Sequence, residues 1–236
     1  MWPFTKQRSA SAVQPNPLPP ELDLAPARRV LVIAPHPDDE TLGCGGTLAR
    51  LASTCDIHVL LVTNGDGGGG LPPGTGERRK QEMDAATKAL GITTPVLHLD
   101  QPDGHFSDSP AFRKALASHL ERLQPNWVFL PWLGDSHLDH SRIARASSEV
   151  LRHSQVEQLL YYETWTPVAA THVVDITTTL ETKKASLLCH ETALKYGNYM
   201  DAMLGLNAYR ALYLAPDQRR WAEALAVTTP YPNRFL

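Results

Sequence analysis

Short apolar runs recur along most of the chain and are separated by longer segments of mixed polarity. The runs are rich in β-branched residues and predict buried strands. The expected strands are Arg29–Ala34, Ile57–Thr63, Val96–Leu99, Trp127–Leu130, Leu159–Glu163 and His172–Asp175. The segments between and after them predict helices over Leu42–Ala52, Glu77–Leu90, Pro110–Leu123, His140–Leu151, Thr178–Lys195 and Tyr199–Leu214. Capping signals mark three of these helices, at Thr75, at Ser109-Pro110 and at Thr178 with Glu181, and Gly91 is a stop signal.

The alternation of strands and helices predicts an α/β fold, a Rossmann-like and mostly parallel sheet with helices on both faces. In such sheets ligands bind outside the carboxyl ends of the strands. Residues 1–26 contain six prolines and few large apolar groups, which predicts a flexible leader. Residues 27–236 are then expected to form a single domain.

Composition narrows the class of protein. Of the 236 residues, 42% are hydrophobic and 20% charged, which is enough apolar material for a core without staples. The net charge of -3 leaves no basic footprint, so nucleic acid is not an expected partner. Three widely spaced cysteines indicate reduced thiols rather than a disulfide framework, and no signal peptide or spanning segment is evident. We expect a cytoplasmic protein whose oligomeric state is open, a homo-oligomer included.

Two clusters of histidine and aspartate follow predicted strands. The first is Pro35-His36-Pro37-Asp38-Asp39-Glu40, directly after the first strand, and charged groups there are costly unless something compensates them. A divalent cation would do so. His36 and Asp39 lie three residues apart in a turn that enters a helix, so both can point at one ion, and Asp38 then remains free for proton transfer.

The second cluster, Asp135-Ser136-His137-Leu138-Asp139-His140, follows the fourth strand. One histidine from it would complete a His/His/Asp set and leave a position open for water, which is the arrangement of a catalytic zinc site. Spacing alone does not decide whether His137, His140 or both are ligands. Other histidines, His190 among them, have no such spacing and are expected at the surface or in structural roles.

Both clusters resemble the motifs of the PIG-L/LmbE-like N-acetylglucosaminyl deacetylases. The resemblance rests on His36-Pro37-Asp38-Asp39-Glu40 and His137-x-Asp139-His140, and extends to Arg79-x-x-Glu82, Pro102-Asp103-Gly104, Tyr162-Glu163-x-Trp165 and Val174-Asp175-Ile176. It implies a hydrolase that removes the acetyl group from an N-acetylglucosamine-type amino sugar. Within the Gly/Pro-rich loop Asn64–Gly76, the run Asn64–Gly70 departs from the family, and its Gly67–Gly70 portion could be a lid or a plain surface connection.

The resemblance also implies roles for single residues. The ligands of Zn²⁺ would be His36, Asp39 and His140, and another divalent metal such as Fe²⁺ would fit the same set. Asp38 would be the general base that takes a proton from metal-activated water, and His137 the general acid and oxyanion partner. Asp139 would orient His137 and favour its charged form.

Residues that face the substrate are less specific in the sequence. Arg79 and Asp103 match positions that hold sugar hydroxyls in the family, and the alternative is a helix-surface arginine and an Asp-Gly turn. Tyr162 and Trp165 could stack on a sugar or belong to the core. Two other functions stay open: a zinc amidase acting on a non-sugar or thiol-conjugate amide, and a catalytically silent binding or scaffold protein. The identity of the group attached to the sugar is not encoded in any motif.

Overall fold

The computed structural model describes residues 18–67, 71–72, 74–215 and 221–230. Seven strands form one sheet, β1 (Arg29–Ala34), β2 (Asp56–Thr63), β3 (Leu97–Gln101), β4 (Trp127–Pro131), β5 (Gln158–Tyr162), β6 (His172–Asp175) and β7 (Ala222–Thr228). The α-helices are α1 (Asp39–Leu51), α2 (Thr75–Ala89), α3 (Pro110–Leu123), α4 (Leu138–Leu151), α5 (Leu180–Cys189), α6 (Glu191–Tyr196) and α7 (Tyr199–Arg210). The spatial order of the strands is β3-β2-β1-β4-β5-β7-β6.

Strand β1 lies at the centre of the parallel part of the sheet. It pairs in parallel with β2 on one side and with β4 on the other. Its sequence RVLVIA is buried on both faces because its side chains alternate between two apolar cores. Val30 and Val32 pack into one core, and Leu31 and Ile33 pack into the other.

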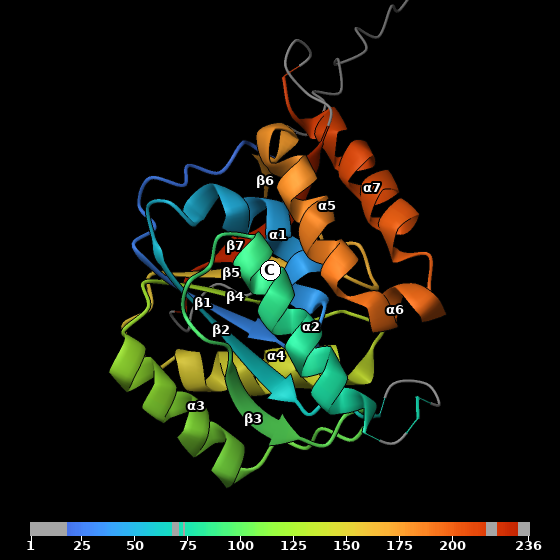
Figure 1. Cartoon of the computed structure of the whole chain (residues 1–236). Coiled ribbons are helices and arrows are strands. Elements are labelled where there is room, and N and C mark those ends of the chain that lie inside the picture. Colours follow the sequence, from blue (N-terminus) through green and yellow to red (C-terminus); the bar gives the residue numbers. More distant parts are fainter. Residues whose placement is uncertain (1–17, 68–70, 73, 216–220, 231–236) are drawn as a thin grey trace, which may run out of the picture.

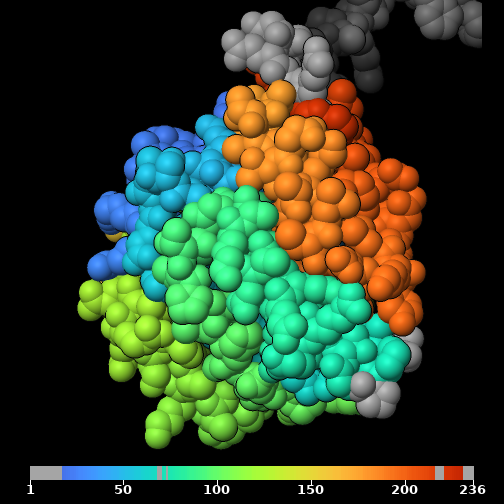
Figure 2. All heavy atoms as spheres, in the orientation of Figure 1, coloured from blue at the N-terminus to red at the C-terminus, as the bar shows by residue number. Residues whose placement is uncertain are grey.

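Helices cover both faces of this sheet (Figure 1). Leu48 of α1 and Met83 of α2 belong to one core, whereas Phe112 of α3 and Ile143 of α4 belong to the other. On the side of the molecule drawn in Figure 2, α2 lies beside the C-terminal helices (orange), and α5 packs on both α1 and α2. The expected fold class, a mostly parallel Rossmann-like sheet with helices on both faces, is therefore confirmed.

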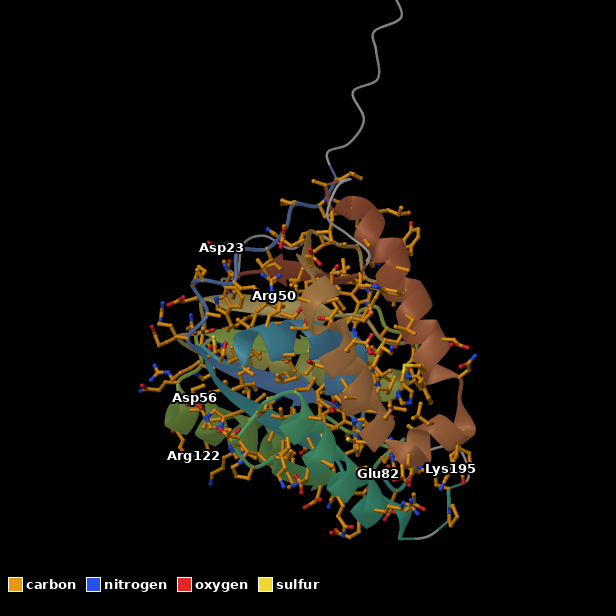
Figure 3. All side chains as sticks on the ribbon, turned by 45° about the horizontal axis from the view of Figure 1, so that its top comes forward. Asp23, Arg50, Asp56, Glu82, Arg122 and Lys195 are labelled. Carbon is orange, nitrogen blue, oxygen red and sulfur yellow. The ribbon has the colours of Figure 1, made fainter. Side chains whose placement is uncertain are left out.

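Buried polar contacts tie the C-terminal helices to the rest of the fold. Glu82, labelled in Figure 3, lies where α2 meets α6, and its carboxylate accepts from the Thr192 backbone N–H at 3.1 Å and from the Thr192 hydroxyl at 2.8 Å. Deeper inside, Lys183 of α5 donates to Glu223 of β7 at 2.6 Å, and both side chains are almost fully buried. Glu223 also accepts the Gly46 and Thr47 backbone N–H groups of α1, each at 2.8 Å, so the buried carboxylate is well satisfied.

Strand β7 is the largest difference from the prediction. No strand was expected after residue 214, yet β7 lies between β5 and β6 and is antiparallel to both. The sequence of β7, AEALAVT, consists mostly of small residues and therefore predicts a strand only weakly. The strand is buried because it lies between two neighbouring strands, which the local sequence pattern does not indicate.

Several predicted helix ends are wrong by a few residues. Helices α1 and α4 begin at Asp39 and Leu138, earlier than expected, so both polar clusters enter the first helical turns. Thr75 is inside α2 and does not cap it, and the expected capping box at Thr178 is absent, because a short 3₁₀ turn over Thr177–Thr179 precedes α5. The Ser109 hydroxyl does cap α3, accepting from the Phe112 N–H at 3.1 Å.

Part of the predicted leader contacts the sheet. The Leu22 backbone N–H donates to Val173 O at 2.8 Å, the Val173 N–H donates to Pro20 O at 3.0 Å, and Leu22 is buried. Residues 20–22 are therefore paired with β6 rather than separate from the fold, because β6 offers them an unpaired edge. Residues 1–17 lie outside the described part of the chain. Among the described helices, none is long and apolar enough to cross a membrane.

Candidate metal and catalytic site

Both polar clusters meet at the carboxyl ends of β1 and β4. These adjacent strands lie where the strand order reverses direction, which is the usual place for a ligand in an open α/β sheet. A cavity of about 110 Å³ opens there and is lined by His36, Asp38, Asp39, Leu42, Arg79, Asp103, His137, Trp165 and Tyr199. Six of the eight residues assigned to the site from the sequence line this cavity, and His140 and Asp139 lie directly behind it.

The three predicted metal ligands form a nearly equilateral triangle. His36 Nδ1 lies 3.2 Å from His140 Nε2 and 3.4 Å from Asp39 Oδ2, and the last two atoms are 3.2 Å apart. Ligand atoms about 2.1 Å from a tetrahedral ion lie about 3.4 Å from one another, so this donor set fits a bound metal. His137 has a ring nitrogen within 4.8 Å of the other two histidines and is an alternative third nitrogen ligand by distance.

The other nitrogen of each triangle histidine contacts a carboxylate. His36 Nε2 lies 3.0 Å from Asp103 Oδ1 and 3.3 Å from Asp139 Oδ2. His140 Nδ1 lies 3.6 Å from Asp135 Oδ2 and 3.2 Å from the Thr164 hydroxyl. Metal-binding histidines usually have such partners, which fix the tautomer and the ring orientation. Asp135 was not among the residues predicted for the site, although it lies only five residues before His140 in the second cluster.

The electrostatic environment favours positive charge. Burial would lower the pKa of His36, but hydrogen bonds with Asp103, Asp139 and Asp39 raise it well above the usual value. Burial is likewise outweighed at His140, where the charge of Asp39 and neighbouring carboxylates raise the pKa to about 9. Because these carboxylates stabilise an imidazolium, they also stabilise a cation bound between the rings.

Asp38 occupies an unusual backbone conformation at the start of α1. Its φ of 130° lies in a region that L-residues rarely adopt, and such strain is typical of functional positions. Its backbone N–H donates to Glu40 Oε2 at 3.3 Å, and Glu40 in turn contacts His190 Nε2 at 3.1 Å. Burial and the charge of Asp39 raise the pKa of Asp38 to about 6. His190 is fully buried and forms part of the support beneath this turn, a role that its sequence context did not indicate.

Arg79 and Asp103 line the cavity but are held by the protein itself. Arg79 is buried rather than on a helix surface, and its guanidinium donates to Gly65 O at 2.9 Å and to Pro37 O at 3.1 Å. The same group lies 3.5 Å from Asp38 Oδ2 and from Asp103 Oδ2. Arg79 is thus held by two backbone oxygens and faces both carboxylates.

His137 is half-buried and lies between the cavity and α4, which it caps. Its Nδ1 accepts the Asp139 backbone N–H at 3.3 Å, so a neutral ring carries its hydrogen on Nε2. Burial, followed by the charges of His140 and His36, lowers the pKa of His137. The charge of Asp139 does favour the charged ring, as expected, but it is outweighed by burial and by the two other histidines.

The carboxylate of Asp139 is occupied elsewhere. Its oxygens accept the Gly104 backbone N–H at 2.7 Å and the Phe106 backbone N–H at 3.1 Å, and Oδ2 also faces His36. Within the described residues, the Asp139 carboxylate has no hydrogen bond to the His137 ring. The Asp139 carboxylate contacts His36, whereas the contact between Asp139 and the His137 ring is made by the Asp139 backbone N–H.

The segment after β5 closes one side of the site. Arg210 of α7 forms a buried pair with Glu163 through Nε at 3.0 Å and Nη2 at 2.6 Å. This pair anchors the segment that carries Thr164 and Trp165, and the Trp165 backbone N–H donates to Asp135 Oδ2 at 3.2 Å. Tyr162 belongs to the core, with its hydroxyl on Ile33 O at 2.8 Å, whereas Trp165 lines the cavity. Residues 68–70 of the predicted Gly67–Gly70 lid lie outside the described part of the chain.

Comparisons with known proteins agree with this geometry. The sequence model of the PIG-L family, described as GlcNAc-PI de-N-acetylase, matches residues 31–151, about half of the chain. Diacetylchitobiose deacetylase of Thermococcus kodakarensis is 26% identical over 190 residues, which cover 70% of each protein. A 1D-myo-inositol 2-acetamido-2-deoxy-alpha-D-glucopyranoside deacetylase of Rhodococcus opacus is 38% identical over 94 residues, covering 35% of this chain and 32% of that protein.

A solved structure of similar extent shares the fold. The conserved protein TT1542 from Thermus thermophilus superposes with a TM-score of 0.73 at 33% sequence identity. The match covers 88% of this chain and 96% of that one, so it extends well beyond the half of the chain that the family model covers.

Proposed function

Since this chain belongs to the PIG-L family of de-N-acetylases, and is thus a hydrolase of amide bonds, we propose that it removes the acetyl group of an N-acetylglucosamine-type sugar. The observation that carries the proposal is the His36–Asp39–His140 triangle, which lies beside Asp38 and His137 at one cavity. The amino-sugar deacetylases among its relatives support the substrate class.

We propose Zn²⁺ as the bound metal, held by His36, Asp39 and His140. Two imidazoles and one carboxylate with an open position are typical of catalytic zinc, and Fe²⁺ would use the same donors. When bound, such a metal would lower the pKa of water and polarise the acetyl carbonyl.

The chain's own residues would handle the protons. Asp38 accepts a proton from the attacking water, and with a pKa near 6 it is ionised at neutral pH and still able to give the proton back. The Nε2–H group of His137 donates a hydrogen bond to the carbonyl oxygen as negative charge develops there, and keeps its proton. When the carbon–nitrogen bond breaks, the proton on Asp38 passes to the amine nitrogen, which leaves acetate and a free amino sugar. The lowered pKa of His137 suits an oxyanion donor better than a proton reservoir.

Supporting roles follow from the contacts. Asp103 and Asp139 would hold His36, Asp135 would hold His140, and Arg79 would hold Asp38. We further propose that residues 27–236 form one catalytic domain and that the enzyme acts in the cytosol, where unpaired cysteines such as the three found here stay reduced.

The deciding experiment is a deacetylation assay on metal-free and reloaded protein. Purified full-length chain is stripped with a chelator, reloaded with Zn²⁺ or Fe²⁺, and incubated with N-acetylglucosamine and N,N'-diacetylchitobiose while acetate and free amine are measured. We expect both products in equal amounts from reloaded protein only. An Asp39→Ala variant should lose both metal and activity. Reloaded protein that releases no acetate from any amino sugar, yet cleaves a non-sugar acetamide, would replace the proposal with the amidase alternative.

A further inference from the structure

The cavity is too small to enclose a whole amino sugar. At about 110 Å³ it is well below the roughly 300–1,000 Å³ of most small-molecule sites, which suits the acetamido group alone. The sugar ring must then lie at the mouth of the cavity, against the side chains that border it. Two of these, Trp165 and Tyr199, are aromatic.

Trp165 is exposed, yet it is held in a defined position. It is 54% exposed, which is unusual for so large an apolar group. Its ring is stacked on His137 with centroids 6.4 Å apart and an interplanar angle of 28°, and it meets Tyr199 edge to face at 5.9 Å. The buried Glu163–Arg210 pair fixes the backbone just before it. An exposed aromatic ring that the protein keeps rigid beside a catalytic histidine is suited to binding a ligand.

Tyr199 adds an unused polar group to the same wall. It is the first residue of α7, it lines the cavity and it is half-buried. Within the part of the chain that the structure describes, its hydroxyl has no hydrogen-bond partner. A phenol placed in this way can donate to or accept from a sugar hydroxyl.

The side chains around the cavity offer no free cation to a phosphate. The lining includes the carboxylates of Asp38, Asp39 and Asp103, and among the described lining residues Arg79 is the one permanently charged cation. Arg79 donates to backbone oxygens and faces two of those carboxylates, so among the described lining residues no guanidinium or ammonium is free to bind a phosphate.

We propose that Trp165 and Tyr199 form a sugar-binding wall that selects an uncharged N-acetylated pyranoside as substrate. The Trp165 ring covers the apolar C–H face of the sugar, and the Tyr199 hydroxyl binds one of its hydroxyl groups. This inference rests on the proposed deacetylase function and adds the substrate class to it.

The first test compares Trp165→Ala and Trp165→Phe with the native enzyme on N,N'-diacetylchitobiose. Trp165→Ala should raise KM by roughly tenfold while kcat changes by less than about threefold, because stacking and burial of one aromatic ring are lost without touching the reacting atoms. Trp165→Phe should restore most of the affinity. Tyr196→Ala is the matched control, since Tyr196 is another exposed aromatic, 61% exposed, that does not line the cavity.

The second test addresses charge. The native enzyme and Tyr199→Phe are compared on methyl N-acetyl-α-glucosaminide and on N-acetyl-α-glucosamine 1-phosphate, which differ in the charge of one substituent. We expect kcat/KM to favour the uncharged glycoside at least tenfold in the native enzyme, and Tyr199→Phe to lower kcat/KM for that glycoside.

The outcomes separate this inference from the function on which it rests. A native enzyme that deacetylates neither sugar overturns the proposed function. A native enzyme that is active, but whose KM is unchanged in Trp165→Ala, overturns the sugar-binding wall alone. Equal or better use of the phosphorylated sugar overturns the preference for an uncharged substrate.

Discussion

Replacing Asp139 by asparagine tests which histidine this carboxylate serves. Asparagine keeps the shape of the side chain, but an NH₂ group takes the place of one carboxylate oxygen. Oδ1 can still accept from the Phe106 N–H, whereas at the Oδ2 position an amide donor would face two other donors, the Gly104 N–H and His36 Nε2. The substitution therefore removes the hydrogen bond from Gly104 and one carboxylate partner of His36, and it leaves the His137 ring without a lost side-chain bond.

The expected loss of metal affinity depends on which partners of His36 remain. Loss of a carboxylate partner of a metal-binding histidine typically lowers metal affinity 10- to 100-fold, or about 1.4 to 2.8 kcal/mol. Asp103 still accepts from His36 at 3.0 Å, so we expect the lower end, about tenfold, for Asp139→Asn. The double variant with Asp103→Asn leaves His36 without either partner and should approach the upper end.

The assay is a measurement of Zn²⁺ affinity by competition with a chromophoric chelator. Asp108→Asn is the control, because Asp108 is an exposed aspartate paired with Arg113 outside the site. It should leave Zn²⁺ affinity unchanged. If Asp139→Asn binds Zn²⁺ as tightly as the native protein but turns over slowly, the carboxylate serves His137 after all, and our interpretation of its contacts is wrong.

Three further predictions concern the proposed general base Asp38, the proposed oxyanion donor His137 and the buried ion pair of Lys183. Asp38→Asn should keep the metal yet lose roughly 10²–10⁴-fold in turnover. Because a base must be ionised, turnover of the native enzyme should decline as pH falls below about 6, and turnover that stays constant there would exclude Asp38 as the base. His137→Ala should keep full metal content and lose roughly 10²–10³-fold in turnover, whereas loss of metal would make His137 a ligand. Lys183→Met leaves the buried Glu223 carboxylate without its positive partner and should lower the free energy of unfolding in urea by about 3–5 kcal/mol. A decrease below about 1 kcal/mol would contradict the buried pair.

The location of the site could be predicted because it depends on topology. Parallel strands place their carboxyl ends on one edge of a sheet, so polar residues that follow two strands are brought together if those strands are neighbours. The clusters at His36 and His140 met that condition, since β1 pairs with β4. Adjacency in space was enough, and no knowledge of side-chain geometry was required.

The partners of single side chains could not be predicted in the same way. Asp139 is two residues from His137 in sequence, but His137 has an extended backbone as the N-cap of α4, whereas Asp139 is already helical, so the two side chains diverge. Arg79 resembled a surface residue of α2, and only the tertiary fold shows that the turn around Pro37 covers it. The contact of His190 could not be predicted for the same reason, since its partner Glu40 is 150 residues away in the sequence.

The position of β7 also has a consequence for how the chain is made. Every residue assigned to the metal site precedes β6, yet β5 and β6 are joined only through β7, which of the described strands is the last to be synthesised. Roughly 60–70 residues separate the end of β5 from the end of β7, so at 5–20 residues per second β5 waits roughly 3–14 s with an unpaired edge. Unpaired edges of this kind promote association between chains. Nascent chains of this enzyme should therefore pass through an interval in which the metal-site residues have been synthesised but the sheet still lacks β7. In that interval they should depend on chaperones.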